Sequence, residues 1–134
     1  MHASSLSQMV LYQLLNEWGY DAFIAHTRRV AKFYETQCQS MVVVAETHLN
    51  DIAEWSVPKG GMFLWLKMRG VSDTFKMVME RGLREKVVFA PGSMFMVDSN
   101  EASSFVRASY SNVTRDNMNL GFQRLRKLVE SESR

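Results

Sequence analysis

The stretch Pro58-Lys59-Gly60-Gly61-Met62-Phe63-Leu64-Trp65-Leu66-Lys67-Met68 decides the fold. Its proline and paired glycines punctuate a turn, and the residues that follow alternate along one strand. The apolar positions 62, 64 and 66 share one face, and Phe63 and Trp65 share the other. We therefore expect a strand over residues 62–68 that is at least partly covered on both faces.

Upstream of this strand the sequence is typical of two helices. Leu11, Leu14, Leu15 and Trp18 recur at i, i+3, i+4 and i+7, and Gly19 suits a left-handed C-cap. A second apolar stripe runs from residue 21 to about residue 49 with nothing to break it. Such a helix would be roughly 40 Å long, more than a domain of this size needs. We expect it to bridge two bodies.

Downstream of the strand the pattern predicts a third helix, two strands and a closing helix. The third helix is capped by Ser72 or Asp73, with these residues facing inward: Phe75, Val78, Met79 and Gly82. The strands follow at 87–90, ended by a Pro-Gly turn, and at 104–109. Thr114 caps the closing helix, whose inner stripe is Met118, Gly121, Phe122, Leu125 and Val129. The fold class expected is α/β: a small mixed sheet layered with helices, preceded by a long interdomain helix.

The composition excludes several classes of protein. The 134 residues suit one domain, and the net charge of +2 is too small to predict nucleic acid or an anionic membrane as a partner. No apolar run approaches the roughly 20 residues of a membrane span. The single cysteine, Cys38, forbids an internal disulfide and favours a reducing compartment. We expect an intracellular protein of the cytoplasm or a mitochondrion, between which the sequence does not choose.

Arg107 is the most informative candidate for a binding residue. It lies in the middle of Phe105-Val106-Arg107-Ala108-Ser109-Tyr110, a short apolar strand in which an unpaired guanidinium is costly to bury. Its planar fork of donors matches a carboxylate at two points, which an ammonium cannot do. The functional interpretation is a carboxylate receptor. The alternatives are an edge-strand arginine that reaches water, or one that pairs with an acid elsewhere in the chain.

Other candidates are better explained as structure. The Gly60-Gly61 turn could let a ligand or another backbone approach closely, with Phe63 and Trp65 as pocket walls, or could simply feed a core strand. The Pro91-Gly92-Ser93 turn could border a cleft or merely end a strand. The structural explanation is favoured for each. His2, His26 and His48 lack metal-ligand spacing, so we expect no metal site. Cys38 has no activating neighbours in sequence, and the basic cluster Arg124, Arg126 and Lys127 is interpreted as a solvated helix face.

Three motifs together resemble a known family. Pro58 to Trp65, Ala90-Pro91-Gly92-Ser93-Met94-Phe95 and Val106-Arg107-Ala108-Ser109-Tyr110-Ser111 occur in the order and spacing of the C-terminal third of fold type I, class I/II pyridoxal-phosphate aminotransferases. The α-aminoadipate/kynurenine aminotransferases are the most similar group. Leu15-Asn16-Glu17-Trp18-Gly19 and Ala53 to Pro58 extend the likeness over nearly the whole chain.

The resemblance implies a transaminase that uses pyridoxal 5'-phosphate and works as a homodimer. Arg107 aligns with the arginine that binds the α-carboxylate of the amino acid or 2-oxo acid, and Phe63 with an aromatic residue near the substrate side chain. Residues 1–134 would form the C-terminal small domain, with residues 1–50 as the helical segment joining it to an absent large domain. No lysine has the sequence context of the Schiff-base residue, so we expect no catalytic or cofactor-binding residue and no turnover in this chain alone.

Two further hypotheses remain open. Transcription regulators exist whose effector domain resembles these aminotransferases, and this chain could be the C-terminal end of one. The chain could instead have a purely interaction role. In any of these cases we expect the long helix and the strand faces to expose apolar surface that a larger protein would cover.

Overall fold

The computed structural model describes residues 4–98 and 100–132. By its internal contacts the chain divides into two compact units, Met1–Phe33 and Tyr34–Arg134. The first helix, α1 (Ser5–Leu49), contributes residues to both units. His2 lies outside the described residues, so the structure does not bear on it.

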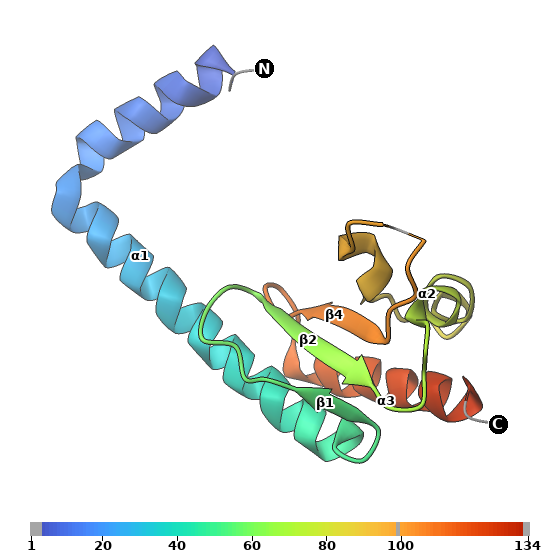
Figure 1. Cartoon of the computed structure of the whole chain (residues 1–134). Helices are drawn as coiled ribbons and strands as arrows, with labels where there is room; N and C mark the ends of the chain where they lie inside the picture. The colour runs from blue at the N-terminus through green and yellow to red at the C-terminus, as the bar shows by residue number, and fades with distance from the viewer. Residues whose placement is uncertain (1–3, 99, 133–134) are drawn as a thin grey trace. The chain divides into compact units, whose positions relative to one another are not determined.

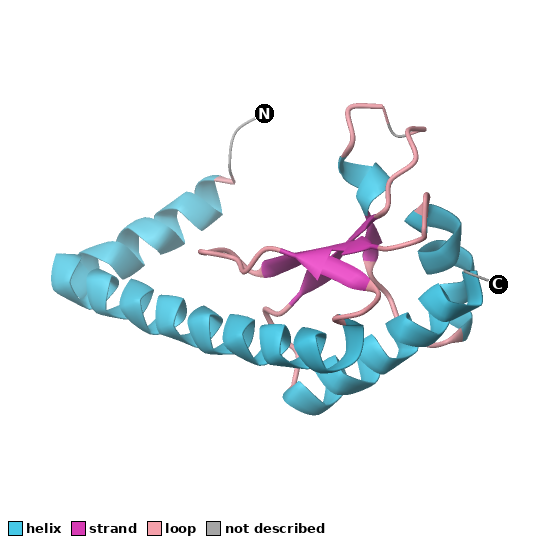
Figure 2. Cartoon of the chain, turned by 60° about the horizontal axis from the view of Figure 1, so that its bottom comes forward, coloured by secondary structure: helices cyan, strands magenta, loops and turns pink. Residues whose placement is uncertain are grey.

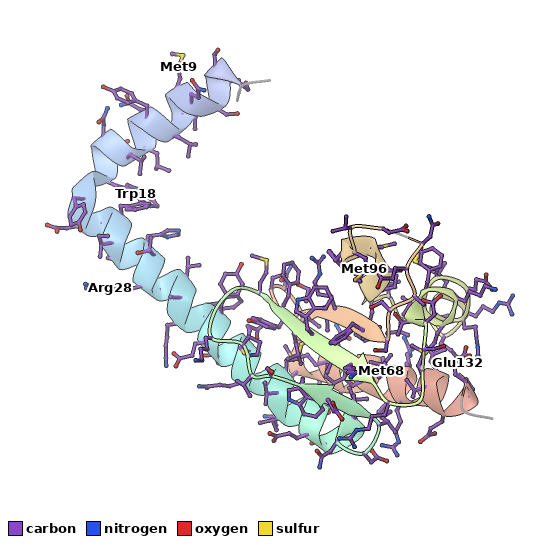
Figure 3. All side chains as sticks on the ribbon, in the orientation of Figure 1. Met9, Trp18, Arg28, Met68, Met96 and Glu132 are labelled. Carbon is purple, nitrogen blue, oxygen red and sulfur yellow. The ribbon has the colours of Figure 1, made fainter. Side chains whose placement is uncertain are left out.

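The first unit is the N-terminal part of α1. Gly19 interrupts it with φ of 66° and ψ of 178°, a conformation that costs glycine little and other residues more. The predicted C-cap at Gly19 is therefore confirmed. The apolar stripe of residues 11–18 is exposed, as are Leu6, Met9 and Tyr20. Figure 3 shows the side chains of this unit, including the labelled Met9, Trp18 and Arg28, standing out from the helix. The expectation of exposed apolar surface is confirmed here.

The second unit is built on a four-stranded sheet, with the strand order β1-β2-β4-β3. The strands are β1 (Ala53–Trp55), β2 (Phe63–Met68), β3 (Ala90–Pro91) and β4 (Phe105–Ser109). The α/β class is confirmed, but every neighbouring pair is antiparallel, so the expected mixed sheet is wrong. The reason is that β4 lies between β2 and β3, which run the same way but never pair.

Short helical segments connect β2 to β4. They are α2 (Thr74–Lys76), the π-helix η1 (Met77–Gly82) and the 3₁₀ helix η2 (Gly92–Phe95). The predicted cap is confirmed, since the Asp73 carboxylate accepts a hydrogen bond from the Phe75 amide at 3.0 Å. The inward placement of Val78 and Gly82 is confirmed, but that of Phe75 and Met79 is wrong. Both of these side chains are exposed, and Met77, the first residue of the wider π turn, is buried instead.

The expected strand over residues 87–90 is also shorter than predicted. The Val87 amide donates to the Gly82 carbonyl at 2.9 Å, so the chain is still bound to the end of the preceding helix. Pairing with β4 begins only at Ala90, opposite Arg107, and ends at Pro91, opposite Val106. Proline has no amide hydrogen to continue the ladder.

The core lies between one face of the sheet and two helices (Figure 1). The helices are α3 (Arg115–Glu132) and the part of α1 from residue 34 onward, and Figure 2 shows both on the same side of the strands. Thr114 caps α3 as predicted: its hydroxyl accepts from the Asn117 amide at 3.3 Å. The sheet and both helices contribute buried side chains to this core: Met41, Val44, Leu49, Leu64, Leu66, Met68, Val106, Ala108, Met118, Phe122, Leu125, Leu128 and Val129.

Arg126 of α3 forms hydrogen bonds to the C-terminal end of α1 and to Asp51, just beyond it. Its guanidinium donates to both carboxylate oxygens of Asp51, at 2.7 and 2.6 Å, and to the His48 carbonyl at 2.8 Å. The hydrogen bond from Arg126 is the main cause that lowers the pKa of Asp51. Arg126 thus keeps a partly solvated position, as expected of this cluster, and adds ion pairs that the sequence did not predict. It closes the C-terminal end of α1, where helix carbonyls lack partners.

Candidate functional site

The second face of the sheet carries the candidate site. We call it the open face, and define it by the residues of β2 and β4 that point away from the helices: Phe63, Trp65, Lys67, Phe105, Arg107 and Ser109. The alternation within each strand produces it, because the intervening residues are the buried ones. One strand pair thus separates a packed apolar core from a surface that combines aromatic rings with cations.

Arg107 lies at the centre of this face. It pairs with Trp65 of β2 on one side and with Ala90 of β3 on the other. The alternative of an edge-strand arginine is therefore wrong, since β4 is an interior strand. Within residues 4–98 and 100–132 no carboxylate forms an ion pair with Arg107, whereas Arg69, Arg81 and Arg126 each have one. The alternative of an internal acidic partner finds no support in the part of the chain that is described.

Two aromatic rings contact the guanidinium of Arg107. Its Cζ lies 3.9 Å from the ring centroid of Phe63 and 4.2 Å from that of Phe95. Ring faces attract a cation through their quadrupole, and this partly replaces the water that the guanidinium loses. The rings cannot accept the in-plane N–H hydrogen bonds that a carboxylate takes, so the hydrogen-bonding capacity of Arg107 remains available.

Trp65 links this pair of rings to the rest of the open face. It meets Phe95 edge to face, with centroids 5.1 Å apart and an interplanar angle of 81°. It meets Phe105 in the same manner at 6.5 Å and 72°. Such tilted contacts are the favoured geometry of aromatic pairs. The four rings therefore form one connected aromatic surface around a single cation.

A groove of about 660 Å³ adjoins this surface. Its lining includes Phe63, Trp65 and Phe105 from the open face and the Gly60-Gly61 turn beside them. Glu54 and Lys67 are the charged groups of the lining, and Glu54 is already paired with Arg69 at 3.1 Å. The groove is thus mainly apolar, with the Gly60-Gly61 turn as one wall. This lining agrees with the pocket-wall interpretation of the turn, which the sequence analysis did not favour.

The Gly60-Gly61 turn is held by Tyr110, the residue that follows β4. Gly61 has a φ of 83°, which favours glycine, and its carbonyl accepts a hydrogen bond from the Tyr110 hydroxyl at 3.1 Å. The Tyr110 amide donates to the Met62 carbonyl at 3.0 Å. Tyr110 is 1% exposed, and burial, with a further contribution from Cys38, raises its pKa to about 12.

We expect this buried phenol to make stability depend on pH above about 10. Below that pH both the folded and the unfolded chain keep Tyr110 protonated, so its contribution is complete. Between about 10 and about 12 the unfolded chain loses the proton while the folded chain retains it, so stability falls by about 1.4 kcal/mol per pH unit. Urea unfolding of the wild type and of Tyr110→Phe between pH 8 and pH 12 measures this. Equal pH slopes in the two proteins would show that Tyr110 is not responsible.

The remaining candidates do not form a second site in the described chain. His48 contacts Asn119 through a 3.1 Å hydrogen bond, and the ring of His26 packs against Trp18. Cys38 is buried, with its thiol 4.0 Å from the Pro58 carbonyl. No group of three or more metal-ligating side chains occurs among the described residues. None of the described helices is both long enough and apolar enough to cross a membrane.

Phe95 is a site residue whose role the sequence did not predict. It entered only as the aromatic end of a Pro-Gly motif, whereas Trp65 was offered with Phe63 as a possible pocket wall and does line the groove. The available signal was the placement of an aromatic residue directly after the turn that ends a strand. It could not be used without knowing that Ala90 pairs with Arg107.

The donor set near Arg107 does not fit pyridoxal phosphate. That cofactor needs a lysine amine for its aldehyde, a charged partner for its ring nitrogen, and donors for its phosphate. The open face provides aromatic rings, one guanidinium and Lys67, and the adjoining carboxylate of Glu54 is engaged by Arg69. The described site therefore suits the carboxylate of a small acid and not the cofactor.

No family model matches the chain. It is 42% identical, over 97% of its length, to the mouse mitochondrial kynurenine/alpha-aminoadipate aminotransferase, and covers 31% of that protein. It is 26% identical over 96% of its length to an uncharacterized HTH-type transcriptional regulator, YdfD of Bacillus subtilis, and covers 25% of it.

The solved structure of LysN, an alpha-aminoadipate aminotransferase from Thermus thermophilus complexed with N-(5'-phosphopyridoxyl)-L-leucine, is 27% identical. It matches 98% of the chain with a TM-score of 0.80, over 32% of its own length. The chain thus spans about a third of the length of the aminotransferases that it matches. The resemblance predicted from the three motifs is confirmed, and this chain is homologous to a segment of the fold type I pyridoxal-phosphate aminotransferases, among them the kynurenine/alpha-aminoadipate enzymes.

Proposed function

We propose that this chain is the small domain of a pyridoxal-phosphate-dependent aminotransferase that moves an amino group between an L-amino acid and a 2-oxo acid. Arg107 binds the α-carboxylate of either acid. The observation that carries the proposal is a guanidinium on an interior strand, framed by Phe63 and Phe95, with no acidic partner in the described chain. The preferred amino acids are of the aminoadipate or kynurenine type, as the names of the relatives suggest.

The rest of the protein completes the enzyme. Pyridoxal phosphate held by that part of the protein would supply the electron sink that transamination needs. The Schiff-base lysine lies outside this chain, which alone turns over nothing, and the complete protein is a homodimer. It works inside the cell, in the cytoplasm or a mitochondrion. Residues 1–50 join this domain to the large one.

Arg107 contributes by orienting the substrate. A carboxylate held at two points by a planar fork has one orientation, so the reacting carbon stays in place relative to the rest of the active site. The aromatic surroundings lower the local dielectric and strengthen that ion pair relative to water. Phe63 lies beside the guanidinium, and we expect its ring to contact the substrate side chain.

The isolated chain offers a direct test of carboxylate binding. We expect 2-oxoadipate, used as the probe, to bind weakly and saturably at Arg107, with NMR shift changes in the amides of residue 90, residues 92–95 and residues 105–109. Arg107→Gln should weaken binding at least tenfold, because the charge and the fork are both removed. Arg84→Gln makes the same charge change at an exposed position outside the open face and should leave binding unaltered. Equal binding by wild type and Arg107→Gln would contradict the proposal.

A second candidate is the effector-domain end of a transcription regulator. The observation in its favour is the 26% identity to YdfD over 96% of the chain. The 42% identity to an aminotransferase favours the enzyme. The two differ in the coding sequence that adjoins this segment in the gene, where a winged-helix module would support the regulator and a large cofactor domain would support the enzyme.

A further inference from the structure

We propose that Phe95 is a positioning residue, whose ring holds the guanidinium of Arg107 in the orientation that receives a carboxylate. This inference rests on the proposed function of Arg107 as the carboxylate receptor, and adds the residue that prepares it. Phe95 does not contact the substrate in this role. It acts through Arg107, so its effects are expected on the free protein as well as on binding.

The contacts of Arg107 show why a positioning residue is needed. In the described chain its guanidinium makes no hydrogen bond or ion pair, and its contacts to Phe63 and Phe95 are the interactions that restrain it. An arginine side chain has several rotatable bonds, and fixing it at the moment of binding lowers affinity. Rings that already restrain the guanidinium reduce this cost before the ligand arrives.

The two rings reach Arg107 from different parts of the fold. Phe63 lies within β2, opposite Ser109 and two residues along from the pair of Trp65 with Arg107. Phe95 is the last residue of η2, outside the sheet, and Trp65 supports it edge to face at 5.1 Å. The strand ladder therefore fixes Phe63, whereas the placement of Phe95 depends on η2 and Trp65.

Gly92, the first residue of η2, packs tightly against β4, and this contact helps to place Phe95. A Cβ on Gly92 would meet the backbone carbonyl and the Cβ of Phe105, each at 2.9 Å. The first residue of η2 thus lies directly on β4, two residues along from Arg107. This contact sets the distance at which the last residue of η2, Phe95, reaches the guanidinium.

Phe95→Leu tests the proposal, since leucine keeps an apolar side chain and removes the ring. The first measurement is the Nε–Hε NMR signal of Arg107 in the free 134-residue chain. The guanidinium lies over the faces of Phe63 and Phe95, whose ring currents shift this signal. Its chemical shift should therefore move toward that of a solvent-exposed arginine when the Phe95 ring is lost. The second is the affinity for 2-oxoadipate, which should fall about threefold, the size of one exposed cation–π contact.

Phe105→Leu is the matched control. Phe105 is 40% exposed and Phe95 44%, both contact Trp65, and only Phe95 stacks on Arg107. The Arg107 signal should therefore be unchanged in Phe105→Leu. Phe95→Tyr keeps the ring and should restore both the signal and the affinity, which a role in general packing alone would not require.

The outcomes separate this inference from the proposed function. If 2-oxoadipate does not bind the wild type but Phe95→Leu shifts the Arg107 signal, the receptor role fails and the restraint of Arg107 by Phe95 stands. If the signal is the same in Phe95→Leu and wild type, the positioning role is overturned whatever the affinity. Should Phe95→Leu lose its folded spectrum, Phe95→Met is measured in its place, and the same two results decide.

Discussion

In a chimera where this chain replaces the matched residues of the mouse relative, Arg107→Lys lowers kcat/KM for amino-acid substrates by about a hundredfold. The chimera supplies the cofactor-binding parts, so that the variant tests this segment alone. Lysine retains the positive charge but has neither the planar fork nor the stacking of the guanidinium on Phe63 and Phe95. Misplacing the substrate in this way is expected to lower kcat/KM by about two orders of magnitude.

The control is Arg69→Lys, which makes the same exchange at an arginine paired with Glu54 at the edge of the sheet. Its steady-state rates should match those of the unmodified chimera. The absorbance of the bound cofactor should be equal in all three proteins, because Arg107 is not proposed to hold it. A loss of less than about tenfold in Arg107→Lys, equivalent to about 1.4 kcal/mol, would remove the two-point carboxylate contact from the mechanism.

Gly92→Ala, which adds one methyl group near the site, is expected to destabilise the folded chain strongly. The new Cβ would overlap Ser103 Oγ and lie 2.9 Å from both the Cβ and the carbonyl oxygen of Phe105. Backbone atoms of β4 cannot move aside without disturbing the strand. The free energy of unfolding should therefore fall by about 1–3 kcal/mol, as is typical of an overpacked site, and η2 should shift away from β4.

Gly60→Ala is the matched control, because nothing lies within 4 Å of the Cβ that it would add. Its stability should be unchanged or slightly higher, since alanine reduces the freedom of the unfolded chain. Urea unfolding of both variants gives the difference. The Arg107 Nε–Hε signal then reports whether the shift of η2 withdraws Phe95. A Gly92→Ala protein as stable as Gly60→Ala would mean that η2 does not lie tightly against β4.

The sequence was a good guide wherever local periodicity decides the structure. Alternation predicted which residues of β2 share a face, and the turn at Gly19 followed from the freedom of glycine. The Asp73 and Thr114 caps were also found, because a cap needs only nearby atoms. These features depend on interactions within a few residues of the chain.

Features that depend on distant pairing were missed. The order β1-β2-β4-β3 places β4 between two strands that the sequence suggests as a β-α-β unit, and the expected mixed sheet failed for that reason. The π turn of η1 changed which side chains point inward. Phe95 was overlooked as a partner of Arg107, because a contact between residues 95 and 107 depends on how β3 and η2 meet β4.

The division of the chain at Phe33 and Tyr34 has a practical consequence for anyone who prepares this protein. All the buried residues of the described chain come from Cys38 onward, whereas Leu6 to Phe33 contribute exposed apolar side chains. A shortened version that begins at Tyr34 would keep these buried residues, the groove and Arg107. It would lack the exposed apolar side chains of Leu6 to Phe33. That version is the natural starting material for crystals and for the titrations above.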